Sequence, residues 1–282
     1  MAAQKSVLIT GCSLGGIGDA LAREFHKRGL QVFATARNTA KMSELKALGI
    51  TTLEMDVTSP ESIKAAVAHV ATASGGRLDI LVNNAGLNHV MPFADCDLAD
   101  VKRVLDTNIF GVFAVTHALL PHLRAAGGVV ANISSVNTVL HPPYQTAYNA
   151  SKAAINTLGD TLRVELAPLG VRVVTIVTGS VASHLFDNAD ERCHLPEGSV
   201  YAPLKERIEK KDFLDGIHWT PTNDYARQVA SDLLRTSPQP VLWRATFATM
   251  AWILNTFGWT GMLDSPMSKR VGLDKLKPPV VQ

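Results

Sequence analysis

Near its N-terminus the chain reads Ser6-Val7-Leu8-Ile9-Thr10-Gly11-Cys12-Ser13-Leu14-Gly15-Gly16-Ile17-Gly18, and a helical apolar pattern follows over residues 19–28. The first five residues are mostly apolar or β-branched, which is typical of a short buried strand. Glycines between a strand and a helix let the backbone approach a pyrophosphate, which the helix N-terminus attracts. Many tight turns contain glycine, but this order of strand, turn and helix favours a dinucleotide site. We therefore expect cofactor contacts from Gly11, Ser13, Gly16, Ile17 and Gly18.

Strand and helix patterns alternate along most of the remaining chain. Strand-like segments cover residues 30–35, 51–57, 79–82, 128–135 and 171–177, with helical patterns between them. Such alternation predicts a parallel sheet with right-handed crossovers. Residues 1–282 contain no internal repeat, low-complexity segment or domain linker, so we predict a single α/β domain with a doubly wound parallel sheet of the Rossmann type. Its dinucleotide-binding core would span residues 5–180.

The end of the second strand bears on which nicotinamide cofactor is bound. In sites that prefer NAD, an acidic residue near this point binds the ribose 2′-hydroxyl. Here Ala36 takes that place and Arg37 follows it, so a 2′-phosphate would meet a cation and no carboxylate. A solvated loop is the alternative explanation for Arg37. We expect NADP(H) to be the cofactor, with Arg37 at the 2′-phosphate.

Later strand ends supply the rest of the expected cofactor site. Asp56 and Val57 end the third strand, where a side chain would meet the adenine ring. The fourth strand runs into Asn83-Asn84-Ala85-Gly86, whose small and amide side chains suit close approach of a cofactor. The cofactor contacts that we expect from these and the sixth strand end are Asp56, Val57, Asn83, Ala85, Gly86, Gly179 and Val181.

Tyr148 and Lys152 lie in a helix predicted over residues 147–167. Positions four apart share a helix face, so the two side chains point the same way. A nearby ammonium lowers the pKa of a tyrosine toward the working pH, which suits Tyr148 to exchange the proton that accompanies hydride transfer at a carbonyl carbon. Ser135, at the end of the fifth strand, would bind the same oxygen. Tyr-x-x-x-Lys alone is a weak signal, because chance places it in many helices.

Asn108 and Gly111 interrupt an apolar helix predicted over residues 99–123. Both residue types disfavour a helix interior, so their presence needs a reason. One reason is a kink that frees backbone groups to bind a water, through which Lys152 would exchange protons with solvent. Simple clearance for helix packing is the other. We include Asn108 with Ser135, Tyr148 and Lys152 in the expected catalytic set.

After residue 180 the regular alternation ends. Residues 181–222 mix polar residues, proline and glycine around one helical run over 204–211, which is typical of a substrate lid. A helix is predicted over 223–234 and a short strand over 240–243, followed by an apolar C-terminal segment within the extension 241–282. Residues 245–263 carry no charge, and three interpretations compete: a membrane-spanning helix, an interfacial segment and a helix that closes the substrate pocket. Threonines and glycines interrupt the run, so a membrane span is the least favoured of the three. We expect a segment that borders the pocket and rests peripherally on a membrane or lipid-droplet surface.

Composition excludes several classes of protein. Hydrophobic residues make up 46% and charged residues 18%, so the chain can bury a large core. A net charge of +2 with no basic run argues against nucleic acid. The histidines and the three cysteines lack metal-ligand spacing, so no metal site is predicted. An odd number of cysteines and no signal-peptide layout favour an intracellular protein, cytoplasmic or peripheral on the endoplasmic reticulum or a lipid droplet.

Taken in order, these motifs resemble the short-chain dehydrogenase/reductase family over residues 7–179. The likeness rests on the glycine turn, Asp56, Asn83-Asn84-Ala85-Gly86, Asn108, Ser135, Tyr148 and Lys152. The resemblance implies that Tyr148 transfers the proton, Lys152 lowers its pKa, Ser135 orients the substrate oxygen and Asn108 completes the relay. It also implies that Tyr148 and Lys152 contact the cofactor. Two departures are the extra residue in the glycine turn and Thr178-Gly179, where most members have Pro-Gly.

Those departures are similar to one subgroup, the fungal NADPH-dependent 1-acyldihydroxyacetone phosphate reductases. Further likenesses are Leu195-Pro196-Glu197-Gly198-Ser199-Val200-Tyr201, Tyr225-Ala226-Arg227-Gln228, Trp243-Arg244 and Gly272-Leu273-Asp274-Lys275-Leu276. The resemblance implies an NADPH-dependent reductase of a ketone on an apolar substrate, acting within lipid metabolism. Lid cations that would meet a substrate phosphate are Arg192, Lys205, Arg207, Lys210 and Lys211, each of which is as well explained by a solvated helix face.

Other functions stay open at this point. Fungal ketoreductases of specialised metabolism resemble the same subgroup, so a polyketide or terpenoid ketone is an alternative substrate. A cyclase or isomerase that uses the fold without net redox chemistry is another, as is a binding module that has lost catalysis. The expected partners are an apolar small-molecule ketone or alcohol and no nucleic acid. The sequence is compatible with a homo-oligomer but does not specify one.

Overall fold

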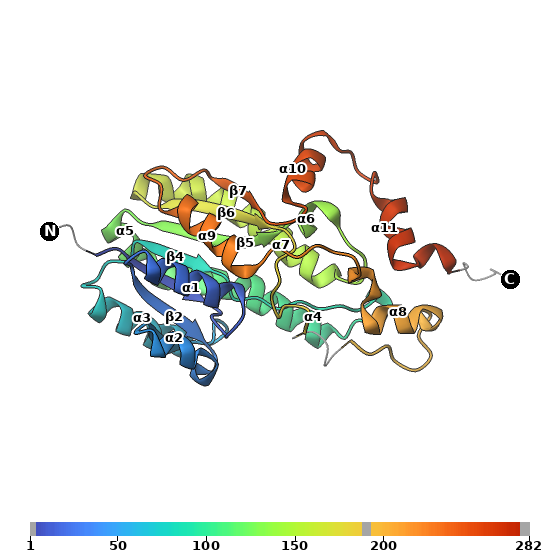
Figure 1. Cartoon of the computed structure of the whole chain (residues 1–282), viewed down its shortest axis with the longest axis horizontal. Coiled ribbons are helices and arrows are strands. Elements are labelled where there is room, and N and C mark those ends of the chain that lie inside the picture. Colours follow the sequence, from blue (N-terminus) through green and yellow to red (C-terminus); the bar gives the residue numbers. More distant parts are fainter. Residues whose placement is uncertain (1–3, 188–192, 277–282) are drawn as a thin grey trace.

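A twisted parallel sheet forms the centre of the molecule (Figure 1). The computed structural model describes residues 4–187 and 193–276. Its seven strands lie in the order β3-β2-β1-β4-β5-β6-β7, and every neighbouring pair is parallel. The strands are β1 (Ser6–Thr10), β2 (Gln31–Ala36), β3 (Thr51–Glu54), β4 (Ile80–Asn83), β5 (Val129–Ser135), β6 (Arg172–Thr178) and β7 (Val241–Arg244). The order reverses between β1 and β4, which is where open α/β sheets bind ligands.

Helices cover both faces of the sheet, because both faces of its strands are apolar. The first face carries α1 (Ile17–Lys27), α2 (Ser43–Ala47) and α9 (Thr222–Leu233); the second carries α3 (Pro60–Ala73), α5 (Gly111–Ala126) and α7 (Thr146–Leu166). Alternation within β1 shows the division: Val7 and Ile9 pack into the first core, whereas Leu8 packs into the second. The predicted doubly wound α/β fold is therefore confirmed.

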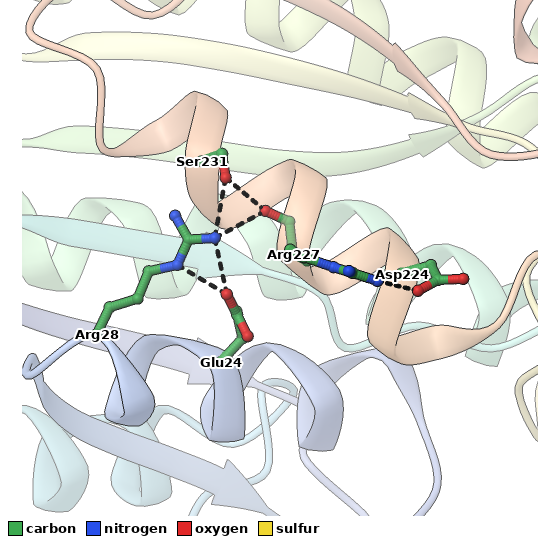
Figure 2. Close-up of polar contacts among 5 residues, drawn as sticks. All are labelled: Glu24, Arg28, Asp224, Arg227 and Ser231. Atoms are coloured by element: carbon green, nitrogen blue, oxygen red, sulfur yellow. Dashed lines mark hydrogen bonds and ion pairs between the residues drawn. The ribbon is translucent and has the colours of Figure 1, made fainter.

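Helix α9 lies beside α1 although about 200 residues separate them in the chain (Figure 2). The Arg28 guanidinium donates to the Arg227 carbonyl at 3.0 Å and to Ser231 Oγ at 2.9 Å. It also pairs with Glu24 at 2.7 Å, while Arg227 pairs with Asp224. These contacts, with the apolar core beneath them, fix α9 on the same face of the sheet as α1.

The helix predicted over residues 99–123 is three segments. α4 (Leu98–Leu105) passes into a π-helical turn, Asp106–Phe110, and then into α5. A Cβ on Gly111 would lie 2.7 Å from Val57 Cγ2, so this glycine is explained by close helix packing, the second of the two reasons considered. The π turn contains Asn108 and supplies the expected irregularity, and such turns are frequent at functional sites.

The lid and the C-terminal extension pack on each other at one end of the sheet (Figure 1). The lid contains α8 (Lys205–Lys210) between two 3-10 turns, Ala202–Leu204 and Asp212–Leu214. The extension contains α10 (Ala248–Phe257) and α11 (Asp264–Val271). Leu204, Ile208 and Phe213 of the lid share an apolar cluster with Val271. Arg207 donates to the Arg270 carbonyl at 3.0 Å, which joins α11 to the lid.

A membrane span in the apolar run 245–263 does not match the structure, because its helix α10 has only 10 residues. Among the described residues, one helix, Leu98–Ala126, is long and apolar enough to cross a membrane by length and composition. Val115, Leu119 and Leu123 of that helix are fully buried against the sheet, so it serves as a core helix.

Candidate active site

One large cavity opens at the carboxyl edge of the sheet and has a volume of about 1360 Å³. The strand ends bring many residues that the sequence placed in the site to its wall. Those of the cofactor set are Gly11, Ser13, Gly16, Ile17, Arg37, Asp56, Val57, Ala85, Gly86, Tyr148, Lys152, Gly179 and Val181, and Ser135 joins them. A single cavity thus runs from the glycine turn to the Tyr148–Lys152 pair.

Three of the expected residues do not line this cavity: Gly18, Asn83 and Asn108. A Cβ on Gly18 would lie 2.4 Å from the Gly11 carbonyl oxygen, so Gly18 allows α1 to pack against the turn. Asn83 is buried, and its Nδ2 donates to Thr116 Oγ1 and Asn132 Oδ1 at 2.9 Å each. Both residues support the fold beneath the site and do not contact the cavity.

The neighbouring residue Asn84 lines the cavity in place of Asn83. Its Nδ2 donates to the carbonyls of Thr10 at 2.8 Å and Gly11 at 3.0 Å, which ties the end of β4 to the glycine turn. Gly11 has φ +74°, and a Cβ there would lie 2.8 Å from Ala85 Cα. Only glycine satisfies both demands, and the turn thereby leaves a shallow cradle of backbone that fits the pyrophosphate of a dinucleotide.

The far end of the cavity from the catalytic pair carries two cations, Arg37 and Lys41. Arg37 follows β2 directly, is exposed, and makes no ion pair within the described residues. Sequence reasoning missed Lys41, which a 3-10 turn over Thr39–Met42 brings to the same wall. The Asp56 carboxylate nearby is held by the Thr58 backbone N–H at 2.8 Å and hydroxyl at 2.7 Å. The cavity can therefore receive an adenosine with a phosphate on its ribose.

Tyr148 and Lys152 share one face of α7, as their spacing predicted, and both are buried. Lys152 Nζ lies 5.6 Å from the centre of the Tyr148 ring and donates to the Ile133 carbonyl at 2.8 Å. Burial lowers the pKa of Lys152 from 10.5 to about 8. An amine with this pKa is mostly protonated at neutral pH, and its positive charge can stabilise a negative oxygen beside it.

The expectation that Lys152 lowers the pKa of Tyr148 is not what this structure shows. Burial raises the pKa of Tyr148 to about 12, and a side-chain hydrogen bond with Ser135 opposes that rise only in part. Burial is the dominant cause because it disfavours the charged phenolate. Tyr148 is thus held as a neutral phenol, the form that donates a proton to a carbonyl oxygen.

Asn108 acts behind the cavity wall. Its Oδ1 accepts from the Leu87 N–H at 2.8 Å, and its Nδ2 donates to the Leu87 carbonyl and to Ser151 Oγ at 2.9 Å each. A Cβ on Gly86 would lie 3.3 Å from Asn108 Oδ1 and 3.7 Å from Lys152 Nζ, so the amide is close to the lysine. With its donors and acceptor engaged by protein, Asn108 positions the segment at Gly86 and Leu87.

Most members of the family that the sequence resembles have proline where this chain has Thr178. The structure shows the hydrogen-bond partner of the Thr178 hydroxyl. Thr178 Oγ1 and Tyr225 Oη lie 2.7 Å apart, and both residues are buried. The Gly179 N–H donates to the Arg244 carbonyl at 2.8 Å, and a Cβ on Gly179 would collide with Thr246 O. This contact with α9 and β7 fixes the strand end that borders the cavity.

The substrate end of the cavity is mostly apolar. Its wall includes Leu140, Phe186, Phe213, Leu214, Ile217, Trp219, Phe247, Met250, Met267 and Val271. The lid cations Lys205, Arg207, Lys210 and Lys211 do not line it; the first three pair with Glu209, Asp212 and Glu206. Arg192 lies outside the described residues. Arg270 of α11, which sequence reasoning missed, also lines the cavity.

Known proteins match the chain over most of its length. The family model described as short chain dehydrogenase matches residues 5–194. A short-chain dehydrogenase/reductase of Pestalotiopsis microspora is 41% identical, with 97% of this chain and 96% of the relative covered. An NADPH-dependent 1-acyldihydroxyacetone phosphate reductase of Schizosaccharomyces pombe is 41% identical over 74% of this chain and 71% of its own.

Solved structures agree with these matches. A short-chain dehydrogenase from Streptomyces avermitilis has a TM-score of 0.76 at 28% identity and covers 98% of this chain and 97% of its own. Members of the family use nicotinamide cofactors, and the glycine turn, the cradle and the Tyr148–Lys152 pair fit one. The chain belongs to the short-chain dehydrogenase/reductase family of oxidoreductases.

Proposed function

We propose that this protein is an NADPH-dependent carbonyl reductase that acts on a ketone within an apolar molecule. The observation that carries the proposal is one continuous cavity with Ser135, Tyr148 and Lys152 at its centre, two cations at one end and an apolar wall at the other. A bound nicotinamide cofactor supplies the hydride. The protein binds and orients the ketone and provides the proton.

The protonation states at the site support the proposed reductive direction. Tyr148, with its pKa raised to about 12, holds a proton that it can donate to the carbonyl oxygen as negative charge develops there. Ser135 donates a hydrogen bond to the same oxygen and polarises the carbonyl. Lys152 stabilises the phenolate that remains, since an opposite charge nearby favours the ionised form.

The preference for NADPH over NADH rests on Arg37 and Lys41. Both line the end of the cavity that is expected to take the adenosine ribose, and no carboxylate stands at residue 36 to bind a free 2′-hydroxyl. The Schizosaccharomyces pombe relative carries NADPH dependence in its name, which supports the same choice.

For the substrate, the apolar wall favours a long or bulky ketone. A 1-acyldihydroxyacetone phosphate would place its acyl chain against that wall, and Arg270 is the side chain that its phosphate would meet. A phosphate-free ketone of specialised metabolism would use the same wall and would not need Arg270. A screen of NADPH oxidation with acyl-dihydroxyacetone phosphates, their dephosphorylated forms and long-chain ketones tests the proposal. If none of these ketones is reduced, and a product still forms without net NADPH turnover, the protein is instead a cyclase or isomerase.

We further propose that the end of α10 rests on a lipid surface. Phe257 and Trp259 are 73% and 71% exposed, Trp252 and Ile253 are half exposed, and Phe247 and Met250 of the same segment line the cavity. An apolar ketone could then enter from the lipid without crossing water. Flotation with liposomes tests this. Phe257→Ser with Trp259→Ser should lose binding, while Phe93→Ser with Leu98→Ser, two exposed apolar residues outside this segment, should keep it. If wild type stays wholly in the aqueous fraction, the lipid contact is wrong.

A further inference from the structure

Gln145 is a buried amide beside the catalytic residues. It directly precedes α7, three residues before Tyr148, and it lines the cavity. The side chain is only 3% exposed. Buried side-chain amides almost always have partners for their donors and acceptors, so the contacts of this one are informative.

A chain of amides fixes which way the Gln145 side chain points. Asn149 Nδ2 donates to the Pro142 carbonyl at 2.9 Å, and a carbonyl oxygen can only accept. Asn149 Oδ1 is therefore the atom that accepts from Asn137 Nδ2, at 3.0 Å. The second hydrogen of Asn137 Nδ2 points to Gln145 Oε1 across 3.4 Å. Gln145 thus turns its oxygen toward Asn137, and its NH₂ group faces away from this chain of amides.

The Gln145 NH₂ group has no hydrogen-bond acceptor among residues 4–187 and 193–276. Because the residue is almost fully buried and borders the cavity, the cavity is where an acceptor can reach this group. Water can fill that place in the free protein. A ligand that brought no acceptor would displace the water and leave a buried donor unpaired, which is unfavourable.

Gln145 is also linked to the residue that binds the reacting oxygen. Ser135 Oγ accepts from the Asn137 backbone N–H at 3.1 Å, and Asn137 is the residue that holds Gln145 Oε1. The serine hydroxyl and the glutamine NH₂ group are therefore held by one short segment on the same side of the cavity. Two donors placed this way suit two oxygens of one substrate that lie a few bonds apart.

We propose that Gln145 binds substrate and donates a hydrogen bond to a second oxygen close to the ketone that is reduced. The substrate class would be ketones with a neighbouring carbonyl, ester or hydroxyl group, such as β-keto esters. This inference rests on the proposed carbonyl reductase function and adds to it a requirement for the second oxygen. It applies to both substrate classes considered above, because it concerns the atoms next to the reacting carbon.

A matched pair of substrates tests the proposal. The methyl ester of 3-oxododecanoic acid carries the second oxygen, and tetradecan-5-one has the same chain length without it. Wild type should favour the keto ester in kcat/KM by about two- to tenfold, the range expected for one neutral hydrogen bond. Gln145→Met keeps the length of the side chain and removes its donor, so the ratio of kcat/KM values should fall by about that factor. Gln145→Glu places an acceptor there and should lower the ratio further.

The ratio of kcat/KM for the two substrates distinguishes a lost hydrogen bond to the second oxygen from general damage to the fold, because such damage lowers both rates together. Gln228→Met, on the exposed side of α9, is the matched control and should keep the wild-type ratio. If neither ketone is turned over, calorimetry measures the binding of each ketone to the protein with NADP bound. The ratio of the two dissociation constants then takes the place of the ratio of kcat/KM values. Equal preference in wild type and both Gln145 variants would overturn the inference while leaving the reductase intact. If both ketones fail to react and also fail to bind, the result counts against the reductase function itself.

Discussion

Lys152→Met should stabilise the protein against unfolding while abolishing its chemistry. The ammonium of Lys152 is buried, and its pKa falls from 10.5 to about 8. This lowering of the pKa corresponds to about 3 kcal/mol by which the buried charge destabilises the folded state near pH 7. Methionine fills a similar volume without charge. The variant also loses the hydrogen bond from Lys152 to the Ile133 carbonyl, which offsets roughly 1–3 kcal/mol of the stabilisation from removing the charge. The net stabilisation is therefore about 1 kcal/mol.

The pH dependence of this difference is the sharper expectation. The folded-state pKa of Lys152 is lowered, so between about pH 8 and 10.5 the unfolded chain binds more protons than the folded one. Wild-type stability should therefore rise with pH across this interval relative to the methionine variant. The advantage of Lys152→Met is largest below about pH 8 and declines by about 3 kcal/mol as the pH approaches 10.5. Other titrating groups are common to both proteins and cancel.

Urea unfolding at several pH values measures this difference directly. Lys64→Met is the control, because Lys64 is exposed on α3 and such changes usually stay within about 0.5 kcal/mol at every pH. A stability difference between wild type and Lys152→Met that does not change with pH would refute the reasoning, since it would mean that Lys152 titrates alike in the folded and unfolded states.

Three further expectations follow from the site and the core. Arg37→Ala should weaken NADPH binding by roughly one to two decades, the value of one charged hydrogen bond, and should leave NADH binding nearly unchanged; equal losses in fluorescence titrations with the two cofactors would contradict the assignment. The rate of ketone reduction should fall as the pH rises past about 8, where Lys152 loses its proton. Lys152→Arg should move this fall in rate to higher pH, because guanidinium stays charged. If the rate falls at the same pH in both proteins, deprotonation of Lys152 is not the cause. Gly159→Ala should destabilise the protein by roughly 1–3 kcal/mol in urea unfolding, since its Cβ would lie 2.2 Å from Thr175 Oγ1, and unchanged stability would show that Thr175 can rotate away freely.

The alternation of strands and helices could be predicted from sequence because it depends on local patterns. Each buried strand is a short apolar run, and each strand end carries its own turn signal, so residues such as Gly11, Ser135 and Gly179 could be assigned to one edge of the sheet. That Tyr148 and Lys152 share one helix face followed from their spacing, and the other motifs in family order singled the pair out as catalytic. These inferences need no knowledge of which distant segments meet.

Other features depend on contacts between distant segments. Lys41 reaches the cavity through a 3-10 turn that bends it beside Arg37, and Arg270 arrives from α11 near the far end of the chain. Three lid cations, by contrast, form local ion pairs with carboxylates on or near the same short helix, in line with the solvated helix face that the sequence offered as one of two explanations. Asn83 and Asn84 are adjacent and alike, and only strand register decides that Asn83 points into the core while Asn84 borders the cavity.

The pKa of Tyr148 shows a second kind of limit. Spacing along α7 correctly places a lysine beside a tyrosine, and attraction between charges alone would lower the tyrosine pKa. How deeply the phenol is buried depends on tertiary packing, which spacing along one helix does not reveal. That burial dominates, and it reverses the sign of the shift.

Tyr148→Phe tests the central claim most directly, that Tyr148 donates the proton in reduction of a ketone by NADPH. The measurement is a single-turnover rate of NADPH oxidation with a ketone that wild type reduces, alongside the dissociation constant of NADPH. Losing a general acid lowers a rate by about 10²–10⁴, so the variant should bind NADPH as wild type does and reduce the ketone at least a hundredfold more slowly. Turnover at the wild-type rate with NADPH binding intact would contradict the account.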